Sequence, residues 1–378
     1  MLWVARLARP RMVQAHSERA GAAPAARIGG PGEVTVSARS SRFAFALCQP
    51  GVERWLKAEL QASRPDLHAG FQRPGLVSFK ATGAEVGPDE SVSAIFARTF
   101  APAHGAARSV DEILAVAERI GARHLWLGPR DQGVPDEVPP ARQAAADAHA
   151  EALETELRAT GRFEAQAPQA GDTILDVITS PDEPAFVGWH SHGPAWPWGP
   201  AGRAALKAPW VTPSRAWRKI SEGLLWSGAP VRRGQRVLEL GASPGGATAV
   251  LVERGLQVFA VDPNPMDPAL LQHASVRFVQ RPMGDLRWED LPPGGVDWLV
   301  CDANIPPAHV IRGLARFLPP LRKRLAGLLL TLKLNDDEVV ADLPNQLEHL
   351  RELGARDLRA TQLPSNRGDV FVYARMGG

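Results

Sequence analysis

Two lysines and two aspartates stand where charged side chains can do chemistry, and three of them stand at the ends of apolar segments. Asp302 closes "DWLVCD", Lys333 closes "LAGLLLTLK" and Asp369 opens "DVFVYAR". Lys219 lies in "SRAWRKISEG", a segment typical of a helix. Only six of the 43 basic residues are lysines, and lysine, unlike arginine, can lose its proton at a working pH. We therefore expect these four groups to hold or move a proton.

Whether Lys333 can accept a proton depends on its pKa, which its surroundings set. Burial and a second ammonium lower the pKa of a lysine, whereas a carboxylate holds the lysine in place. We predict a pKa of Lys333 shifted toward neutrality, with Asp302 as its positioning partner. The group would then remove the proton of a weakly acidic hydroxyl, which attacks a methyl group held in line. The alternative is a buried lysine–aspartate pair that only neutralises itself.

The segment "VLELGASPGGATAVL" (237–251) allows two incompatible interpretations. Gly241 to Gly245 fits G-x-S-x-G, the elbow that presents a nucleophilic serine in α/β-hydrolases. The residue after that serine must donate a backbone N–H to the oxyanion hole, and Pro244 has none. The same residues also form a glycine-rich turn between a strand and a helix, which lets a nucleotide-like ligand approach the backbone. We favour the second interpretation.

Asp262 follows this turn at a distance of about twenty residues, where an acid binds ribose hydroxyls. The loop is not G-x-G-x-x-G and contains a proline, so S-adenosylmethionine fits better than a dinucleotide. Asp285 in "RPMGDLRW" is either an adenine contact or a solvated loop residue. A ligand-free turn is the alternative for the whole motif. The predicted cofactor-binding residues are Gly241, Ala242, Ser243, Pro244, Gly245, Gly246, Asp262, Asp285 and Asp302.

Strands alternating with helices position these residues. In the C-terminal half, strands are predicted at 236–240, 256–261, 276–279, 296–302, 325–332, 355–362 and 369–375. This pattern predicts an α/β domain with a parallel, right-handed, doubly wound sheet, whose ligands bind at the carboxyl ends of the strands. Three of the four charged groups stand at strand ends and Lys219 stands on a preceding helix, so we expect all four to meet at that crevice.

The N-terminal half is predicted to hold one or two small α+β domains. Strands are expected at 43–48, 75–81, 93–100, 173–180 and 184–190, and helices after residue 50, at 109–122 and near 141–160. Ser109 precedes Glu112 by three residues, the spacing of a capping box. The predicted divisions are an extension over 1–40, domains over 41–105 and 106–195, a linker over 196–215 and a catalytic domain over 216–378.

Composition sets broad limits on the kind of protein. The chain has 378 residues and a net charge of +2, and its longest apolar run is too short to span a bilayer. Cys48 and Cys301 show no metal-binding spacing, so we expect no metal, disulfide or membrane partner. Residues 1–40 resemble a transit peptide in composition, but a disordered extension is favoured. Since no secretory signal is visible, a cytoplasmic location is expected.

The segment around the predicted linker combines cations with aromatic side chains. Six of the eleven tryptophans lie between Trp189 and Trp226. Cations for phosphates and aromatic rings for unstacked bases predict a single-stranded RNA surface, on which Trp196 and Trp198 are expected to be the most exposed. The alternative is that the tryptophans pack a domain interface and the arginines are solvated. The basic residues, set against one acid (Glu222), are Arg203, Lys207, Arg215, Arg218, Lys219, Arg232, Arg233 and Arg236.

These motifs together resemble a known family. The glycine loop, "VDPNPM", "WLVCDA", "LKL" and the final acid-Val-x-Val strand resemble the FtsJ-like RNA ribose 2′-O-methyltransferases, which use a Lys-Asp-Lys-Glu tetrad. The stretches "LCQPGVERWLKAEL", "IFAR", "PAWPWG" and "PSRAWRKISEG" narrow the resemblance to the M-type 23S rRNA cytidine 2′-O-methyltransferases. The resemblance extends from about residue 43 to about residue 375.

The resemblance implies a Rossmann-like S-adenosylmethionine-dependent domain after ferredoxin-like and THUMP-like RNA-binding domains. It implies single-stranded or loop RNA of 23S rRNA as the partner, and not DNA. Lys219, Asp302 and Lys333 match three tetrad members, with Lys333 as the general base. Asp369 stands where the family has glutamate, one methylene longer. The alternatives are a catalytically weakened RNA-binding protein, a 2′-O-methyltransferase for another RNA, and a small-molecule methyltransferase.

Overall fold

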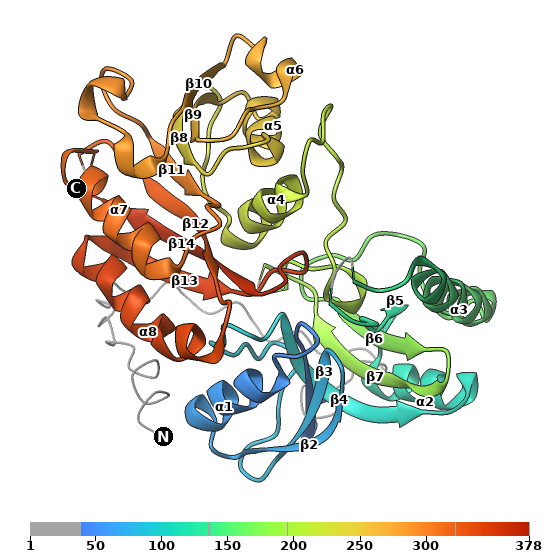
Figure 1. Cartoon of the computed structure of the whole chain (residues 1–378). Helices are drawn as coiled ribbons and strands as arrows, with labels where there is room; N and C mark the ends of the chain where they lie inside the picture. The colour runs from blue at the N-terminus through green and yellow to red at the C-terminus, as the bar shows by residue number, and fades with distance from the viewer. Residues whose placement is uncertain (1–38, 135–136, 195, 322, 378) are drawn as a thin grey trace, which may run out of the picture.

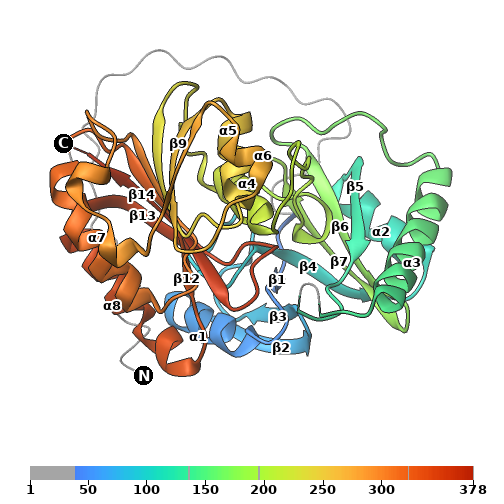
Figure 2. The same ribbon diagram turned by 45° about the horizontal axis from the view of Figure 1, so that its top comes forward.

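The structure, a computed structural model, describes residues 39–134, 137–194, 196–321 and 323–377. The prediction for residues 1–40 therefore lies, but for its last two positions, outside the described residues. The chain forms two seven-stranded sheets, one in each half, which lie side by side in both views (Figure 1, Figure 2). The two halves are connected by the segment that runs from the first sheet into helix α4 (Figure 1).

The N-terminal sheet has the strand order β2-β3-β1-β4-β7-β6-β5. Strand β4 pairs with β1 through its first residues and with β7 beyond Ala103, so the two predicted small domains share one sheet. The division into domains stays a proposal. The elements are β1 (Phe43–Leu47), α1 (Glu53–Ser63), β2 (Leu67–Arg73), β3 (Leu76–Ala81), β4 (Thr99–Ala107), α2 (Val110–Ile120), β5 (His124–Pro129), α3 (Pro140–Ala159), β6 (Thr173–Ser180) and β7 (Glu183–Ser191).

Three differences from the predicted elements have physical causes. Strand β2 is a mostly exposed edge strand and β5 begins with a histidine and ends in Gly-Pro, so neither shows the expected apolar pattern. The strand predicted over 93–100 begins only at Thr99. The N–H groups of Ile95 and Phe96 donate instead to the buried carboxylate of Glu59, at 3.1 and 3.0 Å. Burial raises the pKa of Glu59 to about 7.

The C-terminal sheet has the order β10-β9-β8-β11-β12-β14-β13. Strands β10 to β12 are parallel, and the order reverses between β8 and β11, which is the ligand-binding switch point of doubly wound folds. The elements are α4 (Ala216–Ser227), β8 (Arg236–Leu240), α5 (Gly246–Glu253), β9 (Gln257–Asp262), α6 (Pro268–Leu271), β10 (Val276–Gln280), β11 (Trp298–Cys301), α7 (Pro307–Leu321), β12 (Gly327–Lys333), α8 (Asp337–Glu352), β13 (Ala355–Thr361) and β14 (Asp369–Met376).

The prediction of an all-parallel sheet is wrong at one strand. Strand β14 runs antiparallel to both β12 and β13, and Asp369 is paired directly with Lys333. In a parallel strand the first residue would lie at the amino edge of the sheet, far from the ligand crevice. Because β14 is reversed, its first residue lies at the carboxyl edge instead.

Apolar layers cover both faces of this sheet. Helices α7 and α8 lie on one face, with Leu314 and Leu347 in the same core cluster as Leu330 (Figure 1). Helices α4 and α5 lie on the other face, where Ile220 and Leu251 belong to a second cluster. Strand β12 is buried along its length except at Lys333, which is why its apolar run ends at the crevice.

The linker tryptophans do not form the predicted exposed surface. Trp198 is 2% exposed and packs in the core beside α4 and α5. Trp196 is half-buried and stacks on His190, with ring centroids 3.8 Å apart. Trp210 is the exposed linker tryptophan, at 52%. The linker folds back against the N-terminal sheet, so packing, rather than RNA binding, explains the first two rings.

Candidate active site

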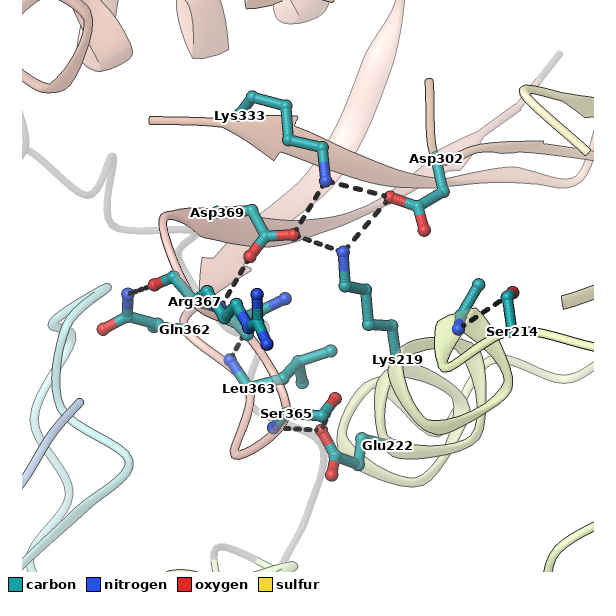
Figure 3. Close-up of polar contacts among 12 residues, drawn as sticks. Ser214, Lys219, Glu222, Asp302, Lys333, Gln362, Leu363, Ser365, Arg367 and Asp369 are labelled. Carbon is teal, nitrogen blue, oxygen red and sulfur yellow. Dashed lines mark hydrogen bonds and ion pairs between the residues drawn. The ribbon is translucent and has the colours of Figure 1, made fainter. Parts of the chain in front are cut away.

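The structure brings all four predicted charged groups together at the carboxyl edge of the C-terminal sheet (Figure 3). The Lys219 ammonium lies 2.5 Å from Asp369 Oδ2 and 3.5 Å from Asp302 Oδ1. The Lys333 ammonium lies 3.1 Å from the same Asp369 oxygen and 3.6 Å from the same Asp302 oxygen. Two cations and two anions therefore alternate around a four-membered cluster, which we call the KDKD cluster.

Each member comes from a different element. Lys219 extends from the second turn of α4, and Asp302 directly follows β11. Lys333 ends β12 and Asp369 begins β14. The side chain of Asp369 is one methylene shorter than the glutamate expected from the resemblance. It nevertheless reaches both lysines.

The charge balance of the cluster contradicts the predicted pKa of Lys333. Burial alone would lower that pKa, but the negative charges of Asp302 and Asp369 outweigh burial and leave the pKa above its ordinary value. Burial likewise opposes ionisation of Asp369, yet Lys219 and Lys333 hold its pKa below the ordinary range. The prediction counted the second ammonium and underestimated the two carboxylates that form ion pairs with Lys333.

The main chain fixes the orientation of Asp369. Its Oδ1 accepts a 2.8 Å hydrogen bond from the N–H of Arg367, so Oδ2 is left to face the two lysines (Figure 3). The turn before it is closed by Asn366, whose side-chain oxygen accepts from the N–H of Leu363 at 2.7 Å. Asp369 is 2% exposed, so this geometry is set by protein groups alone.

Sequence reasoning did not identify the residues that dock α4 against this turn. Glu222, one turn after Lys219, accepts hydrogen bonds from the N–H and hydroxyl of Ser365, at 2.9 and 2.6 Å (Figure 3). Burial raises the pKa of Glu222. The sequence feature that could have identified Glu222 is its position as the one acid in a basic segment. Glu222 ties the helix that carries Lys219 to the turn that carries Asp369.

Gly223 allows α4 to approach β14 closely. A Cβ atom at this position would lie 2.1 Å from the ring of Phe371. We predict that Gly223→Ala lowers the free energy of unfolding by about 1–3 kcal/mol, because overpacking forces the helix away from the sheet. Chemical denaturation checks this. Gly193→Ala is the matched control, since a Cβ there meets no atom within 4 Å; equal effects of the two substitutions would contradict the packing argument.

The glycine loop lies beside the cluster. Gly241 has φ +78° and a Cβ there would lie 2.7 Å from Ala303, next to Asp302. Gly245 has φ +114°, and a Cβ there would lie 2.2 Å from Leu270. Both positions therefore require glycine for backbone conformation and for packing against the protein itself.

Polar contacts also argue against a nucleophilic Ser243. Its hydroxyl donates to the carbonyl of Pro265 at 2.7 Å, and Pro244 has no N–H to offer an oxyanion. The Ser243 N–H donates to Asp262 Oδ2 at 3.1 Å, and the other oxygen of Asp262 accepts from the N–H of Asn264 at 2.8 Å. Asp262 thus joins the glycine loop to the end of β9.

Two further acids border this region in different ways. Glu239 on β8 is fully buried beneath the loop and accepts a 2.7 Å hydrogen bond from the Thr248 hydroxyl of α5. Burial raises the pKa of Glu239 to about 8. Asp285, in contrast, is an exposed residue in a short 3₁₀ turn after β10. Its role as an adenine contact stays a prediction.

A cavity of about 540 Å³ opens beside Lys219, between the two halves of the chain. Both halves and the linker contribute cations to it, and burial together with Arg367 and Arg218 lowers the pKa of Arg215. Asp131 pairs with two of these cations, including Arg203 at 3.1 Å. The cationic residues that line the cavity are Arg98, Arg203, Arg215, Arg218 and Lys219.

This arrangement divides the predicted basic surface. Arg236 begins β8, at the amino edge of the parallel strands, and its guanidinium donates to the carbonyl of Pro293 at 2.6 Å. Arg232 and Arg233 immediately precede that strand, so these three residues lie at the opposite edge from the KDKD cluster. Only the first part of the predicted surface faces the cavity.

Within the described residues, no group of three potential metal ligands is close enough to hold an ion. In the same part of the chain, no helix has both the length and the apolar character needed to cross a membrane.

A doubly wound sheet with a glycine loop at its switch point and a charged cluster beside it defines a nucleotide-ligand-binding α/β domain of the Rossmann-like class. Residues 212–339 match the family model described as FtsJ-like methyltransferase. The C-terminal half of the chain therefore contains an FtsJ-like methyltransferase domain.

Relatives extend the similarity beyond that domain. A protein named Ribosomal RNA large subunit methyltransferase M from Halorhodospira halophila is 35% identical over 48% of this chain and 52% of its own length. The protein of that name from Azoarcus sp. is 28% identical over 74% of this chain and 78% of its own length. The chain spans about half the length of several such curated relatives.

Among solved structures, Aeropyrum pernix fibrillarin in complex with S-adenosyl-L-methionine is similar over 53% of this chain and 82% of that chain. The TM-score is 0.31 and the sequence identity 16%.

Proposed function

We propose that this protein transfers a methyl group from S-adenosylmethionine to the ribose 2′-hydroxyl of a cytidine in 23S rRNA. The KDKD cluster carries the proposal, because each of its two lysines forms an ion pair with both aspartates next to the glycine loop. The similarity to proteins named Ribosomal RNA large subunit methyltransferase M supports the choice of substrate.

The residues around the glycine loop fit S-adenosylmethionine. The Asp262 carboxylate ends β9, the strand next to β8 and its glycine loop. Its Oδ1 accepts from the N–H and the side-chain amide of Asn264, whereas its Oδ2 accepts only from the Ser243 N–H, which leaves Oδ2 able to accept from a ribose hydroxyl. The loop ends at the N-terminus of α5 and offers no long phosphate cradle. S-adenosylmethionine supplies a methyl group on a positively charged sulfur. Asp302 borders both this loop and the two lysines.

In the proposed mechanism, Lys333 accepts the proton of the 2′-hydroxyl. Its raised pKa means that Lys333 is protonated in the free protein and must lose that proton first. A positive charge brought close to Lys333, together with exclusion of water, favours the neutral amine. Lys219 remains positively charged and stabilises the developing oxyanion, while Asp302 and Asp369 hold both amines in position.

The basic cavity gives RNA a route to this cluster. Arg203, Arg215 and Arg218 can bind phosphates, while Lys219 connects the cavity to the reacting groups. Trp217 also lines the cavity and offers an aromatic surface to an unstacked base. A single-stranded or loop segment fits such a site better than a duplex, because its ribose can turn toward the cluster.

Two alternatives differ from this proposal in testable ways. An RNA-binding protein without turnover was suggested by the change from glutamate to aspartate, but Asp369 reaches both lysines. A small-molecule methyltransferase has no need of the five cations in the cavity between the halves. It would show no RNA affinity at moderate salt, whereas phosphate contacts give binding that weakens steeply as salt rises.

The direct test uses tritiated S-adenosylmethionine and 23S rRNA that lacks its 2′-O-methyl groups. We expect label in rRNA with the wild-type protein and none when the same rRNA is already methylated. RNA binding at low salt without any label would support the non-catalytic alternative. Label that requires another RNA would retain the enzyme class and reject 23S rRNA as substrate.

The proposed ribose contact of Asp262 can be tested separately. Asp262→Asn is expected to weaken S-adenosylmethionine binding by about tenfold or more, because a charged hydrogen-bond acceptor is lost. Isothermal titration calorimetry with S-adenosylhomocysteine measures this without turnover. Asp285→Asn in parallel tests the adenine contact, since unchanged affinity would identify Asp285 as a solvated residue. Unchanged affinity in Asp262→Asn would reject the assignment of the ribose site.

A further inference from the structure

Among the described residues, the α-helices of the N-terminal half all pack on one face of the N-terminal sheet, and only the short 3₁₀ turn Pro200–Gly202 packs on the other, which we call the helix-free face. The apolar side chains beneath α2 and α3, such as Leu175 and Val187, point to one face, and residues beneath α1, such as Val77, point to that same face. On the other face, the buried rings of Phe45 and Phe186 form a separate small cluster with Ala201 and Trp196 of the linker.

A cavity of about 450 Å³ lies on this helix-free face, across strands from both predicted small domains. Its volume is within the roughly 300–1,000 Å³ of ligand-binding pockets. Of the five large apolar side chains that are exposed among the described residues, two line this cavity: Phe43 at 49% and Phe71 at 43%. Apolar rings that stay in solvent on a sheet face indicate a binding surface.

The rings are combined with arginines. The Phe71 ring is parallel to Phe186, with a 10° interplanar angle and centroids 6.4 Å apart. The Arg73 guanidinium lies 4.3 Å from the centroid of Phe71. Arg73 and Arg130 share one carboxylate, Glu183, at 3.1 and 3.4 Å. Such a stack of aromatic rings and a guanidinium plane is suited to nucleobases.

The charge of the cavity favours a polyanion. Arg73, Arg108 and Arg130 line it, and Glu183 is the one acid among its lining residues. The local balance is therefore positive, which suits phosphates next to stacked bases. An apolar protein partner would gain little from three arginines around the rings.

The cavity also adjoins the cleft of the proposed active site. Arg130 lines the cavity on the helix-free face, and the next residue, Asp131, lines the cavity beside Lys219. An RNA strand that leaves the catalytic cleft past residues 130–132 would thus reach the rings of Phe43 and Phe71. The two cavities lie on either side of one short loop after β5.

We propose that this helix-free face is a second RNA-binding surface, on which single-stranded RNA flanking the target stacks its bases on Phe71 and Phe43. We call it the sheet-face site, defined by Phe43, Phe71, Arg73, Arg108, Arg130 and Phe186. The inference rests on the proposed function in that it takes RNA as the partner. Its role is to anchor substrate, and no reacting group lies in it.

The test compares Phe71→Leu with Phe71→Trp in the full chain. Leucine retains apolar volume without a π-face, whereas tryptophan retains stacking. We expect Phe71→Leu to weaken binding of a long single-stranded fragment of 23S rRNA by about fivefold or more, the effect of losing one base–aromatic stack. Phe71→Trp should bind at least as well as wild type. Fluorescence anisotropy measures both, and thermal unfolding verifies that both variants fold.

The readouts separate this inference from the proposed function. Binding is measured without turnover, so a protein that binds RNA but transfers no methyl group can still confirm the sheet-face site. If methylation does occur, Phe71→Leu should raise the KM for long RNA and leave kcat unchanged. Equal RNA affinity of wild type and Phe71→Leu would overturn the proposal. A change in self-association, measured by sedimentation, with unchanged RNA affinity would also overturn it and identify a protein interface.

Discussion

Replacement of Lys333 by arginine is expected to lower methyl transfer at least about a hundredfold, the lower end of what a positioned general base contributes. Arginine keeps the positive charge between Asp302 and Asp369, so the cluster remains neutral. Its guanidinium cannot lose a proton at any working pH. The substitution therefore removes proton transfer and preserves the charge balance.

Two comparisons make this expectation specific. Lys333→Ala should be at least as inactive, but it also leaves the buried Asp369 and the half-buried Asp302 with a single lysine and is expected to lower stability. Lys57→Ala, on the surface of α1, is the matched control and should retain wild-type rates. The measurement is single-turnover transfer of labelled methyl at saturating S-adenosylmethionine. Substantial activity of Lys333→Arg would show that Lys333 only contributes charge.

Asp369→Asn is expected to move the pH dependence of the reaction to lower pH. In wild type, Asp302 and Asp369 hold the pKa of Lys333 above its ordinary value, so the neutral amine increases as pH rises and kcat/KM rises with it. Removal of one negative charge lowers the pKa of Lys333. The rising limb of the profile then lies at lower pH, although the maximal rate falls because the lysines are held less firmly.

The profile of kcat/KM from pH 7 to pH 11 measures this shift, because the window extends past the ordinary pKa of a lysine. Asp357→Asn serves as the control, since Asp357 is an exposed carboxylate paired with Arg375 at 3.0 Å and away from the cluster. Asp369→Glu should keep the wild-type limb because it keeps the charge. A limb that does not move in Asp369→Asn would mean that Lys333 is not the titrating group.

The same pKa directions predict how the cluster responds to acid. The pKa of Asp369 is lower in the folded chain than its ordinary value, so its contribution to stability is present above that ordinary value. The contribution is lost as pH falls through the lowered pKa. As pH is lowered, Asp369→Asn should therefore unfold at a higher pH than the wild type, because the variant lacks this contribution at every pH.

The sequence predicted the C-terminal half well because its signals are local. Strands β8, β9, β11 and β12 are short apolar runs, and Asp302 and Lys333 stand at the ends of β11 and β12, where doubly wound sheets bind ligands. The direction of β14 could not be predicted from such runs, since apolar composition does not distinguish parallel from antiparallel pairing. Asp369 reached the correct edge through a strand reversal that the prediction had not included.

Features that depend on tertiary contacts were predicted less well. The raised pKa of Lys333 follows from its ion pairs with two carboxylates, whereas sequence spacing indicates only that they are near. Trp196 and Trp198 were expected to be exposed, but Trp196 stacks on His190 and Trp198 is buried in the apolar cluster of α4 and α5. Glu222 and Gly223 dock α4 through contacts with Ser365 and Phe371, more than a hundred residues away along the chain.

The most direct test of the proposed chemistry identifies the methylated nucleoside. Unmethylated 23S rRNA is incubated with S-adenosylmethionine and the wild-type protein or Lys333→Arg, digested to nucleosides and analysed by mass spectrometry. We expect 2′-O-methylcytidine with the wild-type protein and none with Lys333→Arg. Cytidine methylated on the base, or 2′-O-methylcytidine formed equally by both proteins, would contradict the assignment of the KDKD cluster as the site of ribose methylation.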